Sequence, residues 1–356
     1  MSIIITDATE RLKDGQSLTE ANMMECIETI MSGDAEEDLI KNFLLALSEK
    51  GESVSDLTGA ARIMRKKASS IKAPHDSVDC CGTGGDQTNT FNISTAVAIV
   101  AAACGVPVAK HGNRAASSKS GAADVLEAMG VNLEIGKSAL EKALKEYRFA
   151  FLMAPNHHKS MRHVASARKS LGQRTIFNLL GPLANPANTR YQLIGVYDKK
   201  WVRPMAETLK KLGTKKAWVV HGNDGMDEIT ICDKTYVAII SEESETITEK
   251  EISPEDFGLE THNFESLKGG DAYDNAKALR ALLEGQTGAY RDIVLANTSA
   301  VLNIHGIAQD LKDGVAKASE AIDSGFAWEN FCDYIAFSRT TESAQEVTPV
   351  IKDGAA

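Results

Sequence analysis

Pro74 divides the chain into two parts with different sequence patterns, and this division most constrains the fold. Before Pro74, apolar residues recur at helical spacing and no run of alternating β-branched residues occurs. After it, short apolar runs alternate with stretches of helical pattern, which is typical of an α/β domain. Proline lacks the backbone N–H that a helix interior needs, so residues 71–75 are predicted to be a linker.

Helix start signals favour a small helical domain ahead of the linker. The letters SLTE at 17–20 have the S-x-x-E form of a capping box. Asp34 with Glu37 predicts a second helix start, and Ser53 with Asp56 predicts a third. The predicted division is a helical domain at 1–72, an α/β domain at 73–345 and a mobile tail at 346–356.

Short apolar runs after the linker predict buried strands. They lie at 78–81, 106–109, 149–153 and 218–220. The segment 237–252, rich in Ser, Thr and Glu around β-branched residues, predicts a hairpin or edge strands. The segment 272–337 is helical in pattern, with breaks at Gly285, Gly306 and Gly325.

Charge and composition exclude several classes of function. The chain has 39 Lys and Arg against 49 Asp and Glu, a net charge of −10, which disfavours unspecific binding to nucleic acid or anionic membrane. No apolar stretch approaches the roughly 20 residues that span a bilayer, and the N-terminus lacks the basic region of a signal peptide. The 6 cysteines form no C-x-x-C pair, so we expect reduced thiols in a cytoplasmic protein, not a zinc ribbon.

Two glycine- and hydroxyl-rich segments follow the first predicted strand. GTGGD at 82–86 lets backbone N–H groups approach an anion, although it lacks the G-K-[ST] of a Walker loop and the last glycine of the dinucleotide fingerprint. NIST at 92–95 opens an apolar helix, and hydroxyls at a helix start either cap it or bind an anion. Alone, the first segment is equally compatible with a flexible turn. Together, the two predict a phosphate site.

The densest motif is KHGNRAASSKSGAAD at 110–124, which follows another predicted strand. Its cations and serines alternate with small residues, as a loop that closes on a polyphosphate requires. Asp227 and Glu228 follow the strand at 218–220, where paired carboxylates can hold Mg²⁺ or form a surface turn. His157 and His158 are not predicted to bind a metal, because neighbouring helical residues point apart.

Taken in order, these motifs resemble the anthranilate phosphoribosyltransferase family over essentially the whole chain. The segments that carry the resemblance are GTGGD at 82–86, NIST at 92–95, KHGNRAASSKSG at 110–121, RTIFNLLGPLANP at 174–186 and the Asp227–Glu228 pair. The resemblance implies transfer of the phosphoribosyl group of phosphoribosyl pyrophosphate to the amine of anthranilate, in tryptophan biosynthesis. It implies a fold shared with pyrimidine nucleoside phosphorylases, in which helices around 165–190 complete the helical domain and a central mixed sheet is flanked by helices. It also implies a homodimer formed through the helical domain.

The resemblance assigns residues to three groups. Those matching phosphoribosyl pyrophosphate contacts are Gly82, Gly85, Asp86, Thr90, Asn92, Ile93, Ser94, Thr95, Lys110, His111, Gly112, Asn113, Arg114, Ala115, Ala116, Ser117, Ser118 and Ala122. Those matching anthranilate contacts are Gly82, Asn113 and Arg168, and those matching ligands of two Mg²⁺ ions are Ser94, Asp227 and Glu228. No catalytic acid or base is assigned, because an aromatic amine is already unprotonated at neutral pH.

One departure and two alternatives accompany the resemblance. Where the family commonly has His-Pro-Ala, this chain has His158-Lys159-Ser160, and we expect the lost proline and the added lysine to alter the start of the following helix. A pyrimidine nucleoside phosphorylase-like enzyme is the first alternative, against which Asn113 and the Asp227–Glu228 pair argue. A non-catalytic nucleic-acid-binding relative is the second, against which the net charge of −10 argues.

Overall fold

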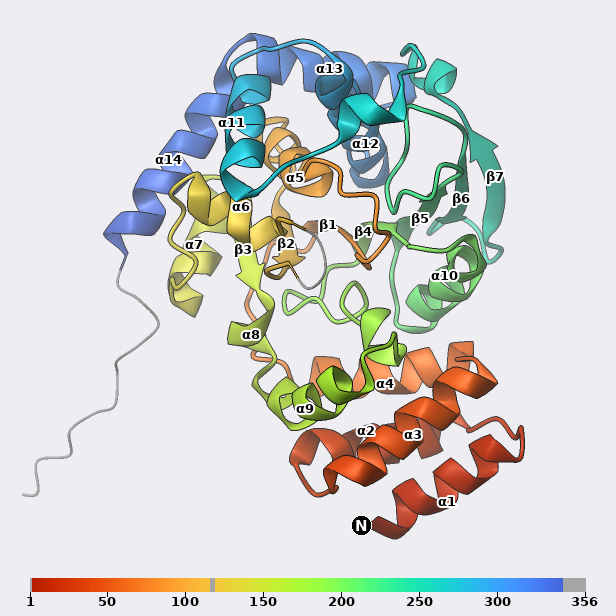
Figure 1. Ribbon diagram of the computed structural model, residues 1–356. Coiled ribbons are helices and arrows are strands. Elements are labelled where there is room, and N and C mark those ends of the chain that lie inside the picture. The colour runs from red at the N-terminus through yellow and green to blue at the C-terminus, as the bar shows by residue number, and fades with distance from the viewer. Residues whose placement is uncertain (1, 116–118, 342–356) are drawn as a thin grey trace, which may run out of the picture.

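A small helical domain and a larger α/β domain build the molecule, as Figure 1 shows. The structure, a computed structural model, describes residues 2–115 and 119–341. The predictions for Ala116, Ser117, Ser118 and the tail at 346–356 lie outside these residues. The first helices are α1 (Ser2–Lys13), α2 (Glu20–Ser32), α3 (Glu37–Lys50) and α4 (Val54–Lys67).

The predicted helix starts have mixed outcomes. At α4 the capping box is confirmed: the Ser53 hydroxyl accepts from the Asp56 N–H at 3.2 Å, and the Asp56 carboxylate accepts from the Ser53 N–H at 2.8 Å. At α2 the predicted Ser17 cap is wrong, because Thr19 caps this helix by accepting from the Asn22 N–H at 3.1 Å. Two local hydroxyls are available there, and the helix begins directly after Thr19, next to the buried Leu18.

The chain returns to the helical domain long after leaving it. The helix α9 (Arg162–Leu171) packs against α2 and α3, and Val164 and Ala167 are buried there. The short α8 (Ala154–His157) leads into it (Figure 1). The helical domain is therefore built from two distant parts of the sequence.

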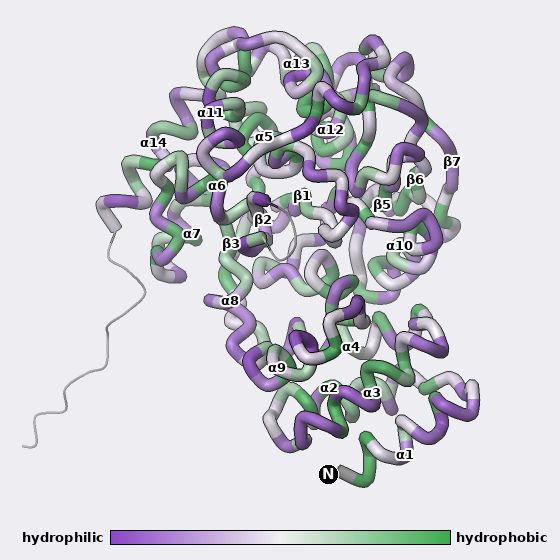
Figure 2. The backbone as a smooth tube through the Cα atoms, in the orientation of Figure 1, coloured by the Kyte–Doolittle hydropathy of each residue, from purple (hydrophilic) through white to green (hydrophobic). Residues whose placement is uncertain are grey.

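A seven-stranded mixed sheet forms the centre of the larger domain, in the order β3-β2-β1-β4-β5-β6-β7. The strands are β1 (Val78–Gly82), β2 (Val108–Gly112), β3 (Phe149–Met153), β4 (Tyr191–Gly195), β5 (Lys216–Gly222), β6 (Thr235–Ile240) and β7 (Thr248–Ile252). The first five strands run parallel, whereas β5–β6 and β6–β7 pair antiparallel. The hairpin predicted at 237–252 is confirmed as β6–β7, and the edge strand β7 is largely hydrophilic in Figure 2.

Helices cover both faces of the sheet. They are α5 (Ile93–Ala103), α6 (Ala122–Ala128), α7 (Lys137–Glu146), α10 (Val202–Lys211), α11 (Ala272–Leu283), α12 (Ala289–His305), α13 (Leu311–Asp323) and α14 (Phe326–Thr340). The last four confirm the helical pattern predicted over 272–337. No helix of the described residues is long and apolar enough to cross a bilayer.

Alternate residues of β4 and β5 enter two separate hydrophobic cores. Leu193, Trp218 and Val220 pack in the core that contains α5 and α12. Ile194 and Val219 pack on the other side, in a core shared with α10 and the helices of the small domain. Because strand residues point alternately to opposite faces, one sheet joins both domains.

Candidate active site

Most of the predicted site residues lie at the carboxyl ends of the parallel strands. In the sheet, β1 lies between β2, the next strand in the chain, and β4. The last residue of β1, Gly82, pairs with Gly195, the last residue of β4. In open α/β sheets such a reversal of strand order leaves a crevice beyond the carboxyl ends, where ligands bind. The glycine loop after β1 and the Asp227–Glu228 pair after β5 both lie at this crevice.

Glycines allow Asp227 to approach the glycine loop closely. The Gly84 N–H donates to the Asp227 carboxylate at 2.8 Å. A Cβ atom on Gly82 would lie 2.2 Å from the same carboxylate oxygen, so a side chain there would displace it. The loop and the carboxylate, 143 residues apart in sequence, therefore form one unit.

Three carboxylates lie close together at this point. The pKa of Asp227 is well above its usual range because of burial, with Asp86 and Glu228 adding like charge. Burial also raises the pKa of Glu228, against the effect of Lys110. Asp86 accepts from the Thr88 hydroxyl at 2.6 Å, and the Asp227 N–H donates to Asp86 at 3.4 Å. Ionising all three carboxylates would place like charges close together in a poorly solvated site, so a bound cation would stabilise their ionised forms.

Lys110 is a buried cation beneath this cluster. It is 1% exposed, and its ammonium donates to the Cys80 carbonyl at 2.6 Å and to the Ser94 hydroxyl at 3.2 Å. Its charge is thus fixed within the domain, beside the predicted metal ligand Ser94. In this arrangement Lys110 orients Ser94 and does not extend into the crevice.

The residues present fit a magnesium ion. Carboxylate and hydroxyl oxygens are the ligands that Mg²⁺ prefers, and it usually completes its shell with water and substrate phosphates. Asp227 supplies such oxygens next to the glycine loop. Glu228 and Ser94 supply them near the Lys110 ammonium. Within the described chain, no three His, Cys, Asp or Glu side chains form a complete metal cage, so a bound cation would need oxygens from elsewhere.

Asn92 joins the NIST segment to two other segments. Its carbonyl oxygen Oδ1 accepts from the Asn275 amide at 2.9 Å, and its own amide donates to the Ser120 carbonyl at 3.2 Å. Thr90 forms a bridge with Lys268, which extends the connection toward α11. The next residues, Ile93 and Thr95, are buried at the start of α5. Asn275 is 2% exposed and was not identified from the sequence.

His111 lies near the end of β2 inside the domain, with its ring 5.1 Å from that of His158. Burial lowers the pKa of His111 to about 3 and that of His158 to about 4. The His111 ring nitrogen Nδ1 lies 3.1 Å from the Gly181 carbonyl oxygen, and the backbone N–H of His111 donates to the buried Asp79 at 3.1 Å. Neutral imidazoles therefore line this part of the site. Asp79 was not identified from the sequence.

Arg168 lies on α9, apart from the strand ends. Its guanidinium lies 5.7 Å from the centre of the Phe177 ring, and burial lowers its pKa. No carboxylate of the described residues pairs with it. A partly desolvated guanidinium beside an aromatic ring suits a small aromatic acid.

Arg174, the first residue of the RTIFNLLGPLANP segment, contacts the glycine loop. Its guanidinium donates to the Gly85 carbonyl and lies 3.9 Å from the centre of the Tyr197 ring. The Tyr197 N–H in turn donates to the Thr83 hydroxyl at 3.0 Å. Arg174 therefore holds the loop from the side of the helical domain.

The remaining predicted contacts lie around the end of β2. Gly112 faces Phe151, and a Cβ atom there would come within 2.7 Å of that ring. Asn113 and Arg114 are exposed, Ala115 is partly buried, and Ala122 begins α6. The Arg114 guanidinium is bound to Glu127 of α6 at 2.8 and 3.0 Å.

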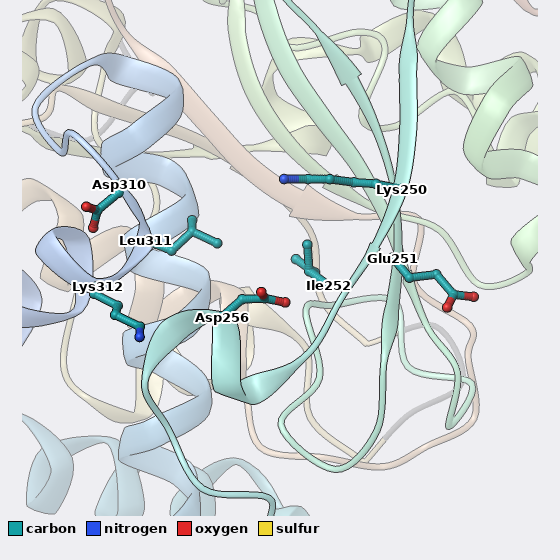
Figure 3. Close-up of a pocket in the computed structure, with 7 residues that line it drawn as sticks. All are labelled: Lys250, Glu251, Ile252, Asp256, Asp310, Leu311 and Lys312. Carbon is teal, nitrogen blue, oxygen red and sulfur yellow. The ribbon is translucent and has the colours of Figure 1, made fainter.

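A separate surface pocket of about 430 Å³ lies between β7 and α13, as Figure 3 shows. Its lining includes Lys250, Asp256 and Lys312, and Glu251 points away from these. The charges are of both signs, and none of the predicted site residues belongs to this pocket. It therefore has no part in the site at the strand ends.

Family models match both domains of the chain. Residues 74–328 match the model described as the glycosyl transferase family, a/b domain, and residues 6–68 match the helical bundle domain of the same family. An anthranilate phosphoribosyltransferase of Azospirillum brasilense is 55% identical over 313 residues, which cover 88% of this chain and 87% of that protein.

Solved structures agree with the sequence comparison. The anthranilate phosphoribosyltransferase of Thermus thermophilus has a TM-score of 0.88 and 40% identity, covering 94% of this chain and 99% of that chain. The Saccharomyces cerevisiae enzyme in complex with PRPP and Mg has a TM-score of 0.86 and 28% identity, covering 94% and 98%. The same yeast enzyme in complex with 4-fluoroanthranilate has a TM-score of 0.86 and 27% identity, covering 95% and 99%.

Proposed function

The chain belongs to the anthranilate phosphoribosyltransferase family, and we propose that it transfers the phosphoribosyl group of phosphoribosyl pyrophosphate to the amine of anthranilate. The products are N-(5-phosphoribosyl)anthranilate and pyrophosphate, in the synthesis of tryptophan. The observation that carries the proposal is the carboxylate cluster of Asp86, Asp227 and Glu228 around the glycine loop. This cluster favours a cation at the point where the predicted phosphate-binding segments meet.

The chemistry needs little acid–base help from the protein. An aromatic amine is unprotonated at neutral pH, so its lone pair attacks the anomeric carbon as the bond to pyrophosphate breaks. Catalysis then rests on holding the two substrates in line and on stabilising the leaving group. Mg²⁺, when bound, supplies positive charge to the departing pyrophosphate. Asp227, Glu228 and Ser94 would hold it, and Lys110 fixes the position of the Ser94 hydroxyl.

The two substrates would bind at different parts of the cleft. We assign phosphoribosyl pyrophosphate to the strand ends, with the glycine loop, the NIST segment and the residues after β2 around it. We assign the anthranilate carboxylate to Arg168, whose guanidinium has no ion-pair partner among the described residues and adjoins the Phe177 ring. A planar guanidinium can meet a carboxylate with two parallel hydrogen bonds.

Three further properties belong to the proposal. The first is that two Mg²⁺ ions bind with the substrate. The second is a homodimer formed through the helical domain, supported by Ile3 of α1, which is 78% exposed. The third is cytoplasmic action, supported by free thiols at all six cysteines. Light scattering of the purified chain tests the dimer, since a monomer mass would refute it.

A fluorescence assay tests the reaction directly. Anthranilate fluorescence should fall only when phosphoribosyl pyrophosphate and Mg²⁺ are both present. Parallel reactions with thymidine and inorganic phosphate test the pyrimidine nucleoside phosphorylase alternative, and a gel shift at physiological salt tests nucleic-acid binding. No loss of anthranilate together with turnover of thymidine would overturn the proposal.

A further inference from the structure

We propose that Asp124 is a positioning residue for phosphoribosyl pyrophosphate binding, because its carboxylate fixes the backbone at Ala115 and at Gly121. The inference rests on the proposed function, in which Asn113, Arg114, Ala115 and Ala122 contact that substrate. Asp124 itself lies in the first turn of α6 and is not among the predicted contacts. It acts through the segments on either side of it.

One carboxylate oxygen of Asp124 binds the backbone N–H groups of two residues that precede α6. Its Oδ2 accepts from the Ala115 N–H at 2.9 Å and from the Gly121 N–H at 2.9 Å. Hydrogen bonds from backbone N–H groups to an ionised carboxylate are among the stronger ones in proteins. The two N–H groups are thereby drawn to a single point in front of α6.

The backbone around this point is tightly packed. A Cβ atom on Gly121 would lie 2.3 Å from the Ala115 nitrogen and 2.9 Å from the Asn113 carbonyl oxygen. The Ala123 N–H also donates to the Asn113 carbonyl at 3.2 Å. Only glycine at 121 permits this approach, and Asp124 supplies the charge that stabilises it. The orientation of residues 113–115 and of Ala122 therefore depends on one side chain.

The second oxygen of Asp124 connects to Arg114. The Arg114 guanidinium donates to Asp124 Oδ1 at 3.1 Å and makes a two-point contact with Glu127. Burial raises the pKa of Asp124, but the Ala115 and Gly121 N–H groups and Arg114 lower it below its usual value overall. Asp124 is thus ionised at neutral pH and engaged on both oxygens.

Glu127 offers a matched control on the same helix. It binds the same guanidinium as Asp124 but none of the backbone N–H groups in front of α6. Removing Glu127 deletes an ion pair and leaves the backbone contacts of Asp124 in place. Removing Asp124 deletes its contact with Arg114 and also its two contacts with backbone N–H groups. Comparing the two variants therefore separates the loss of an ion pair from the loss of the backbone contacts.

The experiment compares Asp124→Ala, Asp124→Asn and Glu127→Ala with the wild-type chain. Steady-state assays give kcat and KM for each substrate, calorimetry with phosphoribosyl pyrophosphate and Mg²⁺ gives its Kd, and amide exchange follows Ala115 and Gly121. Asp124→Ala should raise the KM and Kd for phosphoribosyl pyrophosphate about tenfold or more, the scale of losing hydrogen bonds to a charged group. The KM for anthranilate at saturating phosphoribosyl pyrophosphate should stay within about twofold, and Glu127→Ala should keep both values near wild type.

Asp124→Asn keeps the shape of the side chain and tests the charge if the alanine variant is poorly folded. It should give an intermediate Kd and faster exchange at Ala115 and Gly121. A lower Tm with unchanged Kd and KM in both Asp124 variants would show a merely structural role and overturn the inference. Equal effects of Asp124→Ala and Glu127→Ala would also overturn it. A wild-type chain that binds phosphoribosyl pyrophosphate but consumes no anthranilate would refute the proposed reaction instead, while the Kd series still tests Asp124.

Discussion

Gly195 and Asp227 are in direct backbone contact: a Cβ atom on Gly195 would lie 1.5 Å from the Asp227 carbonyl oxygen. Gly195 ends β4, next to Gly82 at the end of β1. Two neighbouring strands therefore end in glycine, and Asp227 contacts both of these glycines. The absence of side chains at both positions lets Asp227 reach the Gly84 N–H.

Gly195→Ala should displace Asp227 and weaken the site. The added methyl group would collide with the Asp227 backbone, which cannot move aside as a flexible side chain could. We therefore expect a loss of about 1–3 kcal/mol in the free energy of unfolding. We also expect a higher Mg²⁺ concentration for half-maximal activity. Thermal unfolding and a Mg²⁺ titration of activity measure these effects. Gly136→Ala is the matched control, since a Cβ atom there meets nothing within 4 Å. A Gly195→Ala variant with the wild-type Mg²⁺ dependence would contradict the geometry.

Asp227→Asn and Glu228→Gln should each raise the Mg²⁺ concentration for half-maximal activity about tenfold or more, the scale of losing one charged partner. Because Asp227 lies beside two like charges, Asp227→Asn should not lower Tm in metal-free buffer. Calorimetric Mg²⁺ titration and thermal unfolding in chelator provide the two measurements. An unchanged Mg²⁺ titration in both variants would mean that the pair holds no metal.

Arg168→Ala should impair anthranilate use more than phosphoribosyl pyrophosphate use. Losing a contact to a carboxylate costs about 1.5–3 kcal/mol, or roughly ten- to a hundredfold in kcat/KM for anthranilate. Arg168→Lys should recover only part of this, because an ammonium cannot make the two-point contact. The test measures the KM for anthranilate, the KM for phosphoribosyl pyrophosphate and the Tm of each variant. Equal impairment of both substrates with a lower Tm would indicate that Arg168 only braces α9 against Phe177.

His158 should make the fold sensitive to acid. Burial lowers its pKa to about 4 in the folded state, so the unfolded chain binds a proton at its ordinary pKa of about 6.5 while the folded chain does not. The contribution of neutral His158 to the free energy of unfolding is therefore fully present above pH 6.5. It is lost as the pH drops toward 4, by on the order of 3 kcal/mol.

Urea unfolding of wild type and His158→Gln across this pH range tests the assignment. At pH 7.5 the free energy of unfolding should be lower for His158→Gln than for wild type. At pH 4.5 the difference between the two free energies should be smaller. A constant difference would show that another group titrates. His163, a partly exposed histidine on α9, offers the control substitution His163→Gln.

Much of the fold could be predicted because its signals are local. The four predicted strand runs correspond to β1, β2, β3 and β5, although β2 begins two residues later than the run at 106–109. The helix α1 was missed, since Ile3, Ile4 and Ile5 are β-branched and carry no start signal. The domain boundary near residue 72 remains a proposal.

The candidate site could be predicted only where its residues form motifs. The glycine loop, the NIST segment and the Asp227–Glu228 pair stand together in the sequence, and the structure brings them to one set of strand ends. Asn275 and Arg174 could not be assigned, because each acts on a partner that is distant along the chain.

The helices, the strands and the chemical character of the loops can be derived from local sequence, because helical spacing, caps and glycine-rich turns depend on neighbouring residues. Which charged groups lie near one another follows instead from how the chain packs. This packing buries Lys110 under Ser94 and not in the crevice, and it places Asp86 beside Asp227. Such contacts depend on the order in which the strands pair. Asp86 and Asp227 are 141 residues apart in the chain, so their contact could not be predicted from the local sequence around either residue.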